Sequence, residues 1–248
     1  MKTIYILWLR QIMRYLRSRS RIVGSLGQPL LFLLALGYGL GSVFQKAGEG
    51  NYFQFLAPGI IGMSIIFTAI FSGIELIWDR QFGFLKETMA APVSRLNIMI
   101  GRTLGGATVA TLQGVIVFLI ALLLGFTPYN WALVPVAVFV MLLVALLFTA
   151  LGTAIASLLE DMQGFQLIMN FLVMPLFFLS GALFPLEGLP TALSAITRFD
   201  PLSYGIDALR ELLMNVTHFG LGVDIVVLFL VTAVFLGIGS YLFSRIEV

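Results

Sequence analysis

The segment from Asp79 to Arg102 mixes charged and apolar residues between two strongly apolar stretches. Its large apolar side chains, which a purely solvated loop would not need, are Phe82, Phe84, Leu85 and Met89. The charged residues Lys86, Glu87 and Arg95 accompany them. This mixture predicts a short helix at a membrane surface that docks on a partner by burying its apolar side chains, with Glu87 fixing the orientation. The alternative is an ordinary cytoplasmic loop held in place by positive charge.

The boundaries of this docking helix follow from two residue types. The helix should end at Ala91, because the ring of Pro92 disfavours a helical conformation in the residue before it. Ser94 can then cap the next helix by accepting a hydrogen bond from an otherwise unpaired backbone N–H. The docking helix is therefore predicted over residues 82–91.

The composition is that of an integral membrane protein. Of the 248 residues, 60% are hydrophobic and 10% are charged, whereas soluble domains carry about 25% charged residues. The mean hydropathy is +1.04. The absence of cysteine excludes disulfides, cysteine-based zinc sites and iron–sulfur clusters. No metal site is therefore expected. The net charge of +2 does not indicate a nucleic-acid surface, so no nucleic-acid partner is expected either.

The sequence lacks an energy source of its own. No lysine follows a glycine, so there is no Walker A phosphate-binding loop. The middle of each apolar stretch lacks Asp, Glu, Lys and Arg, the groups that ion-coupled transporters place there. The same absence gives no support for a strongly cationic ligand. Glu75, near the end of one stretch, is expected to snorkel or to pair with Arg80. The chain is therefore passive or takes its energy from a partner.

The first 21 residues predict an amphipathic helix in the headgroup layer of a membrane. Its arginines fall on one narrow stripe at spacings of four, three and four: Arg10, Arg14, Arg17 and Arg21. Trp8 lies opposite them, so the arginines are expected to face anionic lipid and the indole to lie among acyl chains. The alternative is the n-region of a signal peptide, but no A-x-A-like cleavage site follows.

Six apolar stretches are each close to or above the ~20 residues that span a bilayer. They are expected at residues 22–44, 54–78, 98–126, 131–159, 163–184 and 221–243. If the N-terminus is cytoplasmic, all 14 Lys and Arg residues except Lys46, Arg198 and Arg210 lie on the cytoplasmic side. The positive-inside rule therefore places both termini and the docking helix in the cytoplasm.

Residues 185–220 are too long and too apolar for a simple outer loop. Asp200 and Pro201 are typical of a helix N-cap followed by proline at the first helical position. Apolar residues then recur at helical spacing as far as Leu213, whereas Asp207, Arg210 and Glu211 lie away from that stripe. The pattern predicts two short helices that dip into the outer leaflet and return. The alternative is that they lie flat as a lid.

Two parts of the chain resemble the ABC-2-type permeases, the membrane subunits of ATP-driven exporters. KETMAAPVSR, residues 86–95, is similar to the family's coupling segment. FLSGALFPLEGLP, residues 178–190, and DPLSYGIDALRELL, residues 200–213, are similar to its outer hairpin. The hairpin residues singled out are Gly181, Pro185, Asp200, Pro201, Tyr204 and Arg210.

The resemblance implies an all-α membrane protein that works as a homodimer with two copies of a separate ATPase. ATP and magnesium would bind to that partner, and no cofactor to this chain. The docking helix would sit in a cleft on the ATPase, and the cargo route would lie between the two permeases. One transmembrane domain over 1–248 is expected, divided into an interfacial helix (1–21), five spans (22–184), an outer hairpin (185–220) and a last span with its tail (221–248).

The small size, without a large outer domain, is similar to the drug- or antibiotic-exporting and polysaccharide-exporting branches. The resulting expectation is export of a lipophilic drug-like or antibiotic compound across the plasma (inner) membrane of a prokaryote. The first alternative is export of a polysaccharide or glycolipid. The second is a stand-alone channel or membrane scaffold, which would leave the apolar ridge at residues 82–89 without a role.

Overall fold

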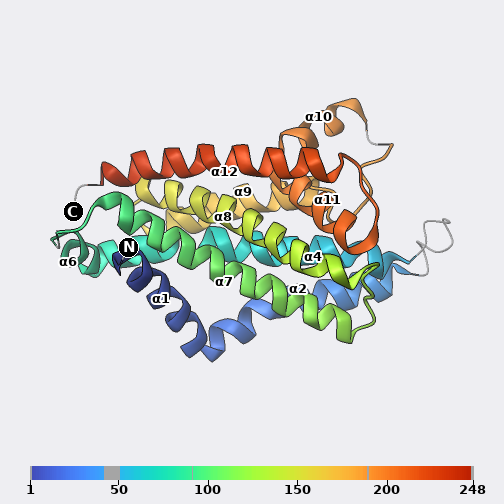
Figure 1. The fold of residues 1–248 in the computed structure, drawn as a ribbon, viewed down its shortest axis with the longest axis horizontal. Coiled ribbons are helices and arrows are strands. Elements are labelled where there is room, and N and C mark those ends of the chain that lie inside the picture. The colour runs from blue at the N-terminus through green and yellow to red at the C-terminus, as the bar shows by residue number, and fades with distance from the viewer. Residues whose placement is uncertain (1, 42–50, 91, 189, 247–248) are drawn as a thin grey trace.

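The computed structural model describes residues 2–41, 51–90, 92–188 and 190–246, and this described part is helical without any strand. The expected all-α fold is therefore confirmed. Figure 1 shows an elongated bundle with both chain termini and α6 at one end and α10 and α11 at the other. We refer to these as the α6 end and the α10 end.

Eleven α-helices follow one another along the described part of the chain. They are α1 (Lys2–Arg17), α2 (Arg19–Gly39), α4 (Tyr52–Phe71), α5 (Ile74–Gln81), α6 (Phe84–Ala90), α7 (Arg95–Leu123), α8 (Val134–Leu158), α9 (Met162–Leu179), α10 (Thr191–Phe199), α11 (Pro201–Met214) and α12 (Leu221–Ser244). A 3-10 turn, Trp131–Leu133, precedes α8.

Six helical segments in the described residues are long and apolar enough to cross a membrane, as the sequence predicts. They correspond to α2, α4 with α5, α7, the 3-10 turn with α8, α9, and α12. The fifth ends at Leu179, five residues before its expected end, because the chain turns at Gly181 with a positive φ of 76°. The expected end of the first span, at residues 42–44, and Lys46 lie outside the described residues.

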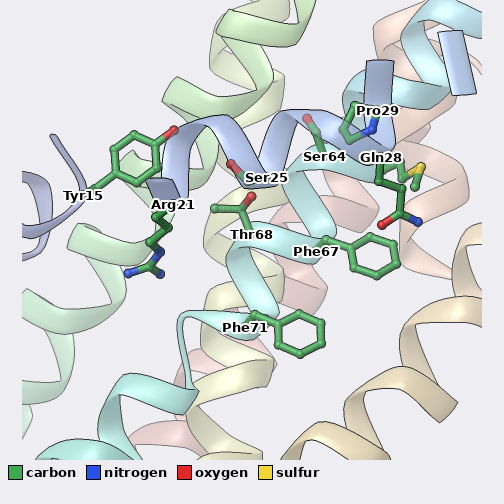
Figure 2. A pocket seen from close by; sticks show the side chains of 11 residues that line it. Tyr15, Arg21, Ser25, Gln28, Pro29, Ser64, Phe67, Thr68 and Phe71 are labelled. Atoms are coloured by element: carbon green, nitrogen blue, oxygen red, sulfur yellow. The ribbon is translucent and has the colours of Figure 1, made fainter. Parts of the chain in front are cut away.

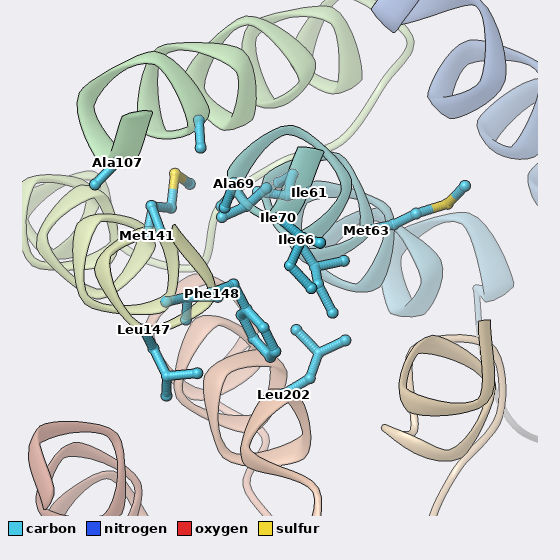
Figure 3. Packing of buried hydrophobic residues seen from close by; sticks show 14 of the residues in the cluster. Ile61, Met63, Ile66, Ala69, Ile70, Ala107, Met141, Leu147, Phe148 and Leu202 are labelled. Atoms are coloured by element: carbon cyan, nitrogen blue, oxygen red, sulfur yellow. The ribbon is translucent and has the colours of Figure 1, made fainter. Parts of the chain in front are cut away.

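The centre of the bundle is α4, which is mostly apolar and has most of its residues buried. It packs against α2, α7, α8 and α11. Figure 3 shows Ile66 and Ile70 of α4 beside Phe148 of α8 and Leu202 of α11. Of the two helices of the predicted outer hairpin, α11 enters this core. Its apolar stripe is fully buried and consists of Leu202, Ile206, Leu209 and Leu213.

The second span consists of two helices. The α4 helix ends at Phe71, and α5 begins at Ile74 after Ser72 and Gly73. A methyl group added at Gly73 would lie 2.5 Å from the carbonyl oxygen of Gly152 in α8, and one added at Gly152 would lie 2.5 Å from that of Ile70. The two backbones therefore approach so closely that only glycine fits at their crossing.

Replacing Gly152 with alanine should destabilise the protein by about 1–3 kcal/mol, because the extra methyl group overpacks this crossing. The measurement is the thermal unfolding midpoint of the purified protein in detergent. Gly27→Ala is the matched control, since nothing lies within 4 Å of a methyl group at Gly27 of α2. Equal unfolding midpoints for the two variants would contradict the tight crossing.

The N-terminal helix packs on the bundle and not only on lipid. Along α7, Gly101 and Gly105 leave room for α1, so that Leu7 lies against the first and Gln11 against the second. Trp8 differs from its expected place among acyl chains, because its indole N–H donates a hydrogen bond to Thr108 Oγ1 at 3.0 Å. The interfacial position of α1 in a membrane stays a prediction, whereas its contact with α7 is a feature of the fold.

Candidate functional site

Asp79 is the centre of an ion cluster near the α6 end. Its carboxylate accepts hydrogen bonds from Arg102 of α7 at 2.6 Å and from Arg10 of α1 at 3.1 Å. The side chains of Asp79 and Arg102 are each only 6% exposed. This cluster joins α1, α5 and α7, and the pair that it contains is buried.

Glu75, one helical turn before Asp79, holds the start of α2. It pairs with Arg21 at 2.5 Å and with Arg14 at 3.3 Å. The expected pairing of Glu75 with Arg80 is therefore wrong. Arg80 bonds instead to Glu160 at 2.9 Å, because α5 turns it towards the loop between α8 and α9.

The arginine stripe of the N-terminal segment thus has a different role from the one expected. Arg10, Arg14 and Arg21 face the carboxylates of α5 and not only lipid headgroups. The stripe also crosses a helix boundary, because α1 ends at Arg17 and Arg21 belongs to α2. Arg17 alone among the four is exposed, whereas the other three are partly buried, so it is the member that still fits the expectation of anionic lipid.

The docking helix begins at Phe84 and not at Phe82. Gly83 separates it from α5 by adopting a positive φ of 79°, a conformation that most residues avoid. The helix ends at Ala90, and the expected last residue, Ala91, lies outside the described residues. Ser94 caps α7 as predicted, because its Oγ accepts the N–H of Asn97 at 3.3 Å.

The apolar ridge predicted at residues 82–89 is divided between the inside and the outside of the molecule. Leu85 is completely buried in this chain's own core, which contradicts its expected role as a docking residue. Met89 packs against the same core, and the guanidinium of Arg10 lies 3.7 Å above the Phe84 ring. The helix is amphipathic, so its apolar side packs inward. Phe82, by contrast, is 79% exposed.

The remaining predicted docking residues differ in their availability. Lys86, Glu87 and Pro92 are exposed. Arg95 is exposed too, but its guanidinium donates to the carbonyl oxygens of Ser244 and Ile246, so it ties α7 to the C-terminal end of the chain. The accessible set, Phe82, Lys86 and Glu87, is called the α6 surface below.

At the α10 end, the predicted N-cap and the two predicted helices are confirmed. Asp200 Oδ1 accepts the N–H of Leu202 at 2.9 Å, and Pro201 is the first residue of α11. Burial raises the pKa of Asp200 to about 7, against the opposing effects of that hydrogen bond and of the nearby Ser203 hydroxyl. Pro185 lies in the turn before α10, partly buried. Re-entry of this hairpin into the outer leaflet stays a prediction.

The charged residues of α11 are less exposed than expected. Arg210 is 6% exposed, donates to the carbonyl oxygen of Gly181 at 3.0 Å and lies 4.1 Å above the ring of Phe55. Burial lowers the pKa of Arg210 to about 10. Asp207 is 3% exposed, because its carboxylate accepts the backbone N–H groups of His218 and Phe219 and so organises the turn into α12.

Tyr204 connects three parts of the same end. Its hydroxyl donates to the carbonyl oxygen of Arg198 at 2.8 Å, and its ring stacks on Phe219 at a centroid distance of 4.7 Å. Burial raises the pKa of Tyr204 above its usual range. The motif residues of the hairpin therefore bind one another and position α10, α11 and the start of α12.

A cavity of about 230 Å³ lies between α2 and α4, with Tyr15 of α1 at its edge. Figure 2 shows the rings of Phe67 and Phe71 projecting from one side of α4, with the amide of Gln28 near Phe67. The polar groups that line the cavity are Tyr15, Arg21, Ser25, Gln28, Ser64 and Thr68. An apolar aromatic wall beside several hydrogen-bonding groups can hold an amphipathic molecule.

Sequence reasoning missed this cavity. Gln28 is a polar residue inside an apolar span, and Ser64 and Thr68 are spaced four residues apart on one face of α4. These are weak signals, because single polar residues also occur in spans without a ligand. The buried hydrogen bond from Tyr15, which lines the cavity, to Gln113 of α7 joins residues 98 positions apart.

Comparison with known proteins gives one family match and several relatives. Residues 2–214 match the family described as ABC-2 type transporter. Proteins named Nodulation protein J are similar over most of their length. That of Rhizobium leguminosarum bv. trifolii is 32% identical over 84% of this chain and 80% of its own length. That of Rhizobium meliloti (strain 1021) is 28% identical over 92% of this chain and 88% of its own length.

Proposed function

Since this chain belongs to the ABC-2 type transporter family, we propose that it is the permease subunit of an ATP-driven exporter of lipophilic, drug-like or antibiotic compounds. Membership of that family implies a multi-pass membrane permease with an ABC ATPase as partner. It also favours an exporter over the stand-alone channel or scaffold that the sequence alone left open. The choice of a lipophilic cargo is based on the cavity between α2 and α4.

The α6 surface is the proposed contact with the ATPase. It lies at the end of the bundle that holds both termini (Figure 1), and the positive-inside rule assigns that end to the cytoplasm. Phe82 presents a large apolar side chain to water beside the opposite charges of Lys86 and Glu87. A partner that buries the ring gains apolar area, and the two charges fix its orientation. The proposed assembly is a homodimer of this permease with two ATPase subunits.

The cavity matches a compound with an apolar body and a small polar part. The faces of Phe67 and Phe71 are nearly parallel, with an interplanar angle of 4° and a centroid distance of 6.2 Å, so they offer a continuous aromatic wall. Hydrogen-bonding groups of Ser25, Gln28 and Thr68 stand beside that wall. We therefore place the lipophilic part of the cargo on the two rings and its polar part towards α2.

A second candidate cargo is a polysaccharide or glycolipid. The hydroxyl and amide groups of the cavity, together with the aromatic faces, are also the groups that bind sugar hydroxyls and the apolar faces of sugar rings. The cavity volume of about 230 Å³ accommodates only a small part of such a chain at once and is below the ~300–1,000 Å³ of typical drug-sized sites, which makes a small lipophilic compound our first choice.

The test is cargo-stimulated ATP hydrolysis by the permease and its ATPase in proteoliposomes. Lipophilic dyes should stimulate hydrolysis, and Phe67→Ala with Phe71→Ala should raise the half-maximal dye concentration by roughly a hundredfold or more, since burial on each of the two rings is worth about 1.5–3 kcal/mol. Phe229→Ala is the matched control, because that ring on α12 is 50% exposed and lies outside the cavity.

Three results would change the proposal. Stimulation by oligosaccharides or glycolipids, but not by dyes, would favour the second candidate. An equal effect of the control variant would contradict the cavity as the cargo site. Failure of any ATPase subunit to associate with the permease would contradict the exporter itself.

A further inference from the structure

The cavity between α2 and α4 has one charged group in its wall, the guanidinium of Arg21. The other described residues that line it are neutral, and neither Asp nor Glu is among them. Figure 2 shows Arg21 and Tyr15 on one side of the cavity and the ring of Phe67 on the other. The charged group and the aromatic wall therefore occupy different places in one cavity, as the head and the body of an amphiphile require.

The positive charge of Arg21 is not cancelled by the carboxylate that it contacts. Glu75 pairs with Arg21 at 2.5 Å, but it also pairs with Arg14 at 3.3 Å. The neighbouring carboxylate of Asp79 is shared in the same way by two further arginines. Four guanidinium groups thus surround two carboxylates, which leaves an excess of positive charge beside the cavity. Such an excess attracts an anion and repels a cation.

Three side chains in the wall keep hydrogen-bonding groups that the described chain does not use. A guanidinium has five N–H donors, and Arg21 uses only Nη1 for its carboxylate partner, while 35% of its side chain is exposed. Thr68 and Gln28 line the cavity without a side-chain hydrogen bond to the described residues. Ser25 and Ser64 differ, because their hydroxyls donate to the backbone of their own helices at 3.0 and 2.8 Å. The unused donors are therefore available to a ligand.

We propose that the cavity binds an amphiphilic organic acid, with its anionic group on Arg21 and Thr68 and its apolar body on Phe67 and Phe71. Carboxylates, sulfonates and phosphates accept several hydrogen bonds, and the planar guanidinium suits their geometry. The inference rests on the proposed function, because the bound acid is the cargo. It narrows that cargo from lipophilic compounds in general to those with an anionic head.

The experiment compares three probes that share a naphthylbutyl body and differ in the head, which is a sulfonate, a hydroxyl or a trimethylammonium group. Their binding to the permease alone, in phosphatidylcholine nanodiscs, is measured by equilibrium dialysis against empty nanodiscs. The sulfonate should bind saturably and roughly tenfold more tightly than the alcohol, as expected for hydrogen bonds to a charged group. The ammonium should bind more weakly than the alcohol. Equal affinities for the three heads would overturn the proposal.

Two variants test Arg21 in opposite directions. Arg21→Gln should lower the affinity for the sulfonate to that for the alcohol and leave the alcohol unchanged. The fold should survive, because Glu75 keeps its ion pair with Arg14. Glu75→Gln should instead tighten the sulfonate, because it releases Arg21 from its internal partner. If Arg21 had only a structural role, both variants would weaken all three probes alike.

The matched control is Arg19→Gln, because Arg19 is exposed on the same helix and lies outside the cavity. It should leave all three affinities unchanged, since salt screens an exposed charge. Phe67→Ala should weaken the sulfonate and the alcohol by the same factor, because both carry the same apolar body. The proposal fails if Arg21→Gln binds the sulfonate as tightly as the unchanged protein, or if Arg19→Gln weakens it equally.

An anionic membrane lipid carries the same chemistry as such a cargo. If phosphatidylglycerol in the nanodiscs removes the difference between the unchanged protein and Arg21→Gln, the occupant is a lipid and the cargo assignment is overturned. A difference that persists supports the cargo. These readings need no ATPase. If the sulfonate is not preferred while dyes still stimulate ATP hydrolysis, the inference fails and the proposed function stands. If the sulfonate is preferred but no ATPase associates, the exporter fails and the site stands.

Discussion

Asp79→Ala should lower the stability of the protein by about 3–5 kcal/mol, the usual cost of leaving one partner of a buried ion pair without the other. Arg102 would remain, 6% exposed, without its carboxylate, and Arg10 would lose the same partner. The unfolding midpoint in detergent, followed by tryptophan fluorescence, should fall by about 6–20 °C for a chain of this size. The contact of α1 with α5 should be weakened but kept, because Arg14 of α1 still pairs with Glu75.

Two further variants isolate the buried pair. Asp79→Ala combined with Arg102→Met should recover much of the loss, because an apolar side chain can replace a buried charge at little cost. Glu160→Ala breaks the ion pair with Arg80. The Glu160 side chain is 79% exposed, so this change should lower the stability by only about 0–1 kcal/mol. If Asp79→Ala melts at the same temperature as Glu160→Ala, Asp79 does not hold the three helices together.

Phe82→Asp with Glu87→Lys should prevent the ATPase from co-purifying with the permease. Burial of one phenylalanine is worth about 1.5–3 kcal/mol, so its loss alone weakens the contact roughly tenfold to a hundredfold, and the reversed charge adds repulsion. Both side chains are exposed, so the permease itself should remain folded and inserted. The measurement is a pull-down from membranes of co-expressing cells, beside a protease-protection assay.

The controls for this pull-down come from the same structure. Tyr129→Asp changes an aromatic residue that is 69% exposed and lies beyond α7, away from α6, and should leave co-purification unchanged. Leu85→Asp should instead disturb the permease, because Leu85 is buried in its own core. Normal co-purification of the double variant would exclude the α6 surface as the ATPase contact and would question its cytoplasmic position.

The sequence predicts the spans well because their signal is local. Membrane insertion depends on runs of apolar residues, and each of the six runs is contiguous in the chain. The helix caps at Ser94 and Asp200 are equally local, because an N-cap binds an N–H two or three residues away. Which partner each helix face contacts depends instead on residues far away in the sequence. The expectations that differ from the structure are of this kind.

The arginine stripe and the docking ridge are examples of this limit. A helical wheel places Arg10, Arg14 and Arg21 together, but their carboxylate partners lie 54 to 69 positions further along the chain. The wheel therefore cannot distinguish anionic lipid from Glu75 and Asp79. In the same way, the apolar side chains of α6 show that one face is buried, but not whether a partner or the chain's own core buries it. Leu85 belongs to the core.

The interruption of the second span at Ser72 and Gly73 makes α5 a short lever. Its pivot point would be Gly73, where its backbone packs closely against that of Gly152 in α8. The lever is eight residues long, about 12 Å, and carries α6 at its far end. Phe71 of the cavity wall lies just before this pivot point. We expect a displacement of α6 to reach the cavity wall at Phe71 through α5, against the resistance of the buried Asp79–Arg102 pair.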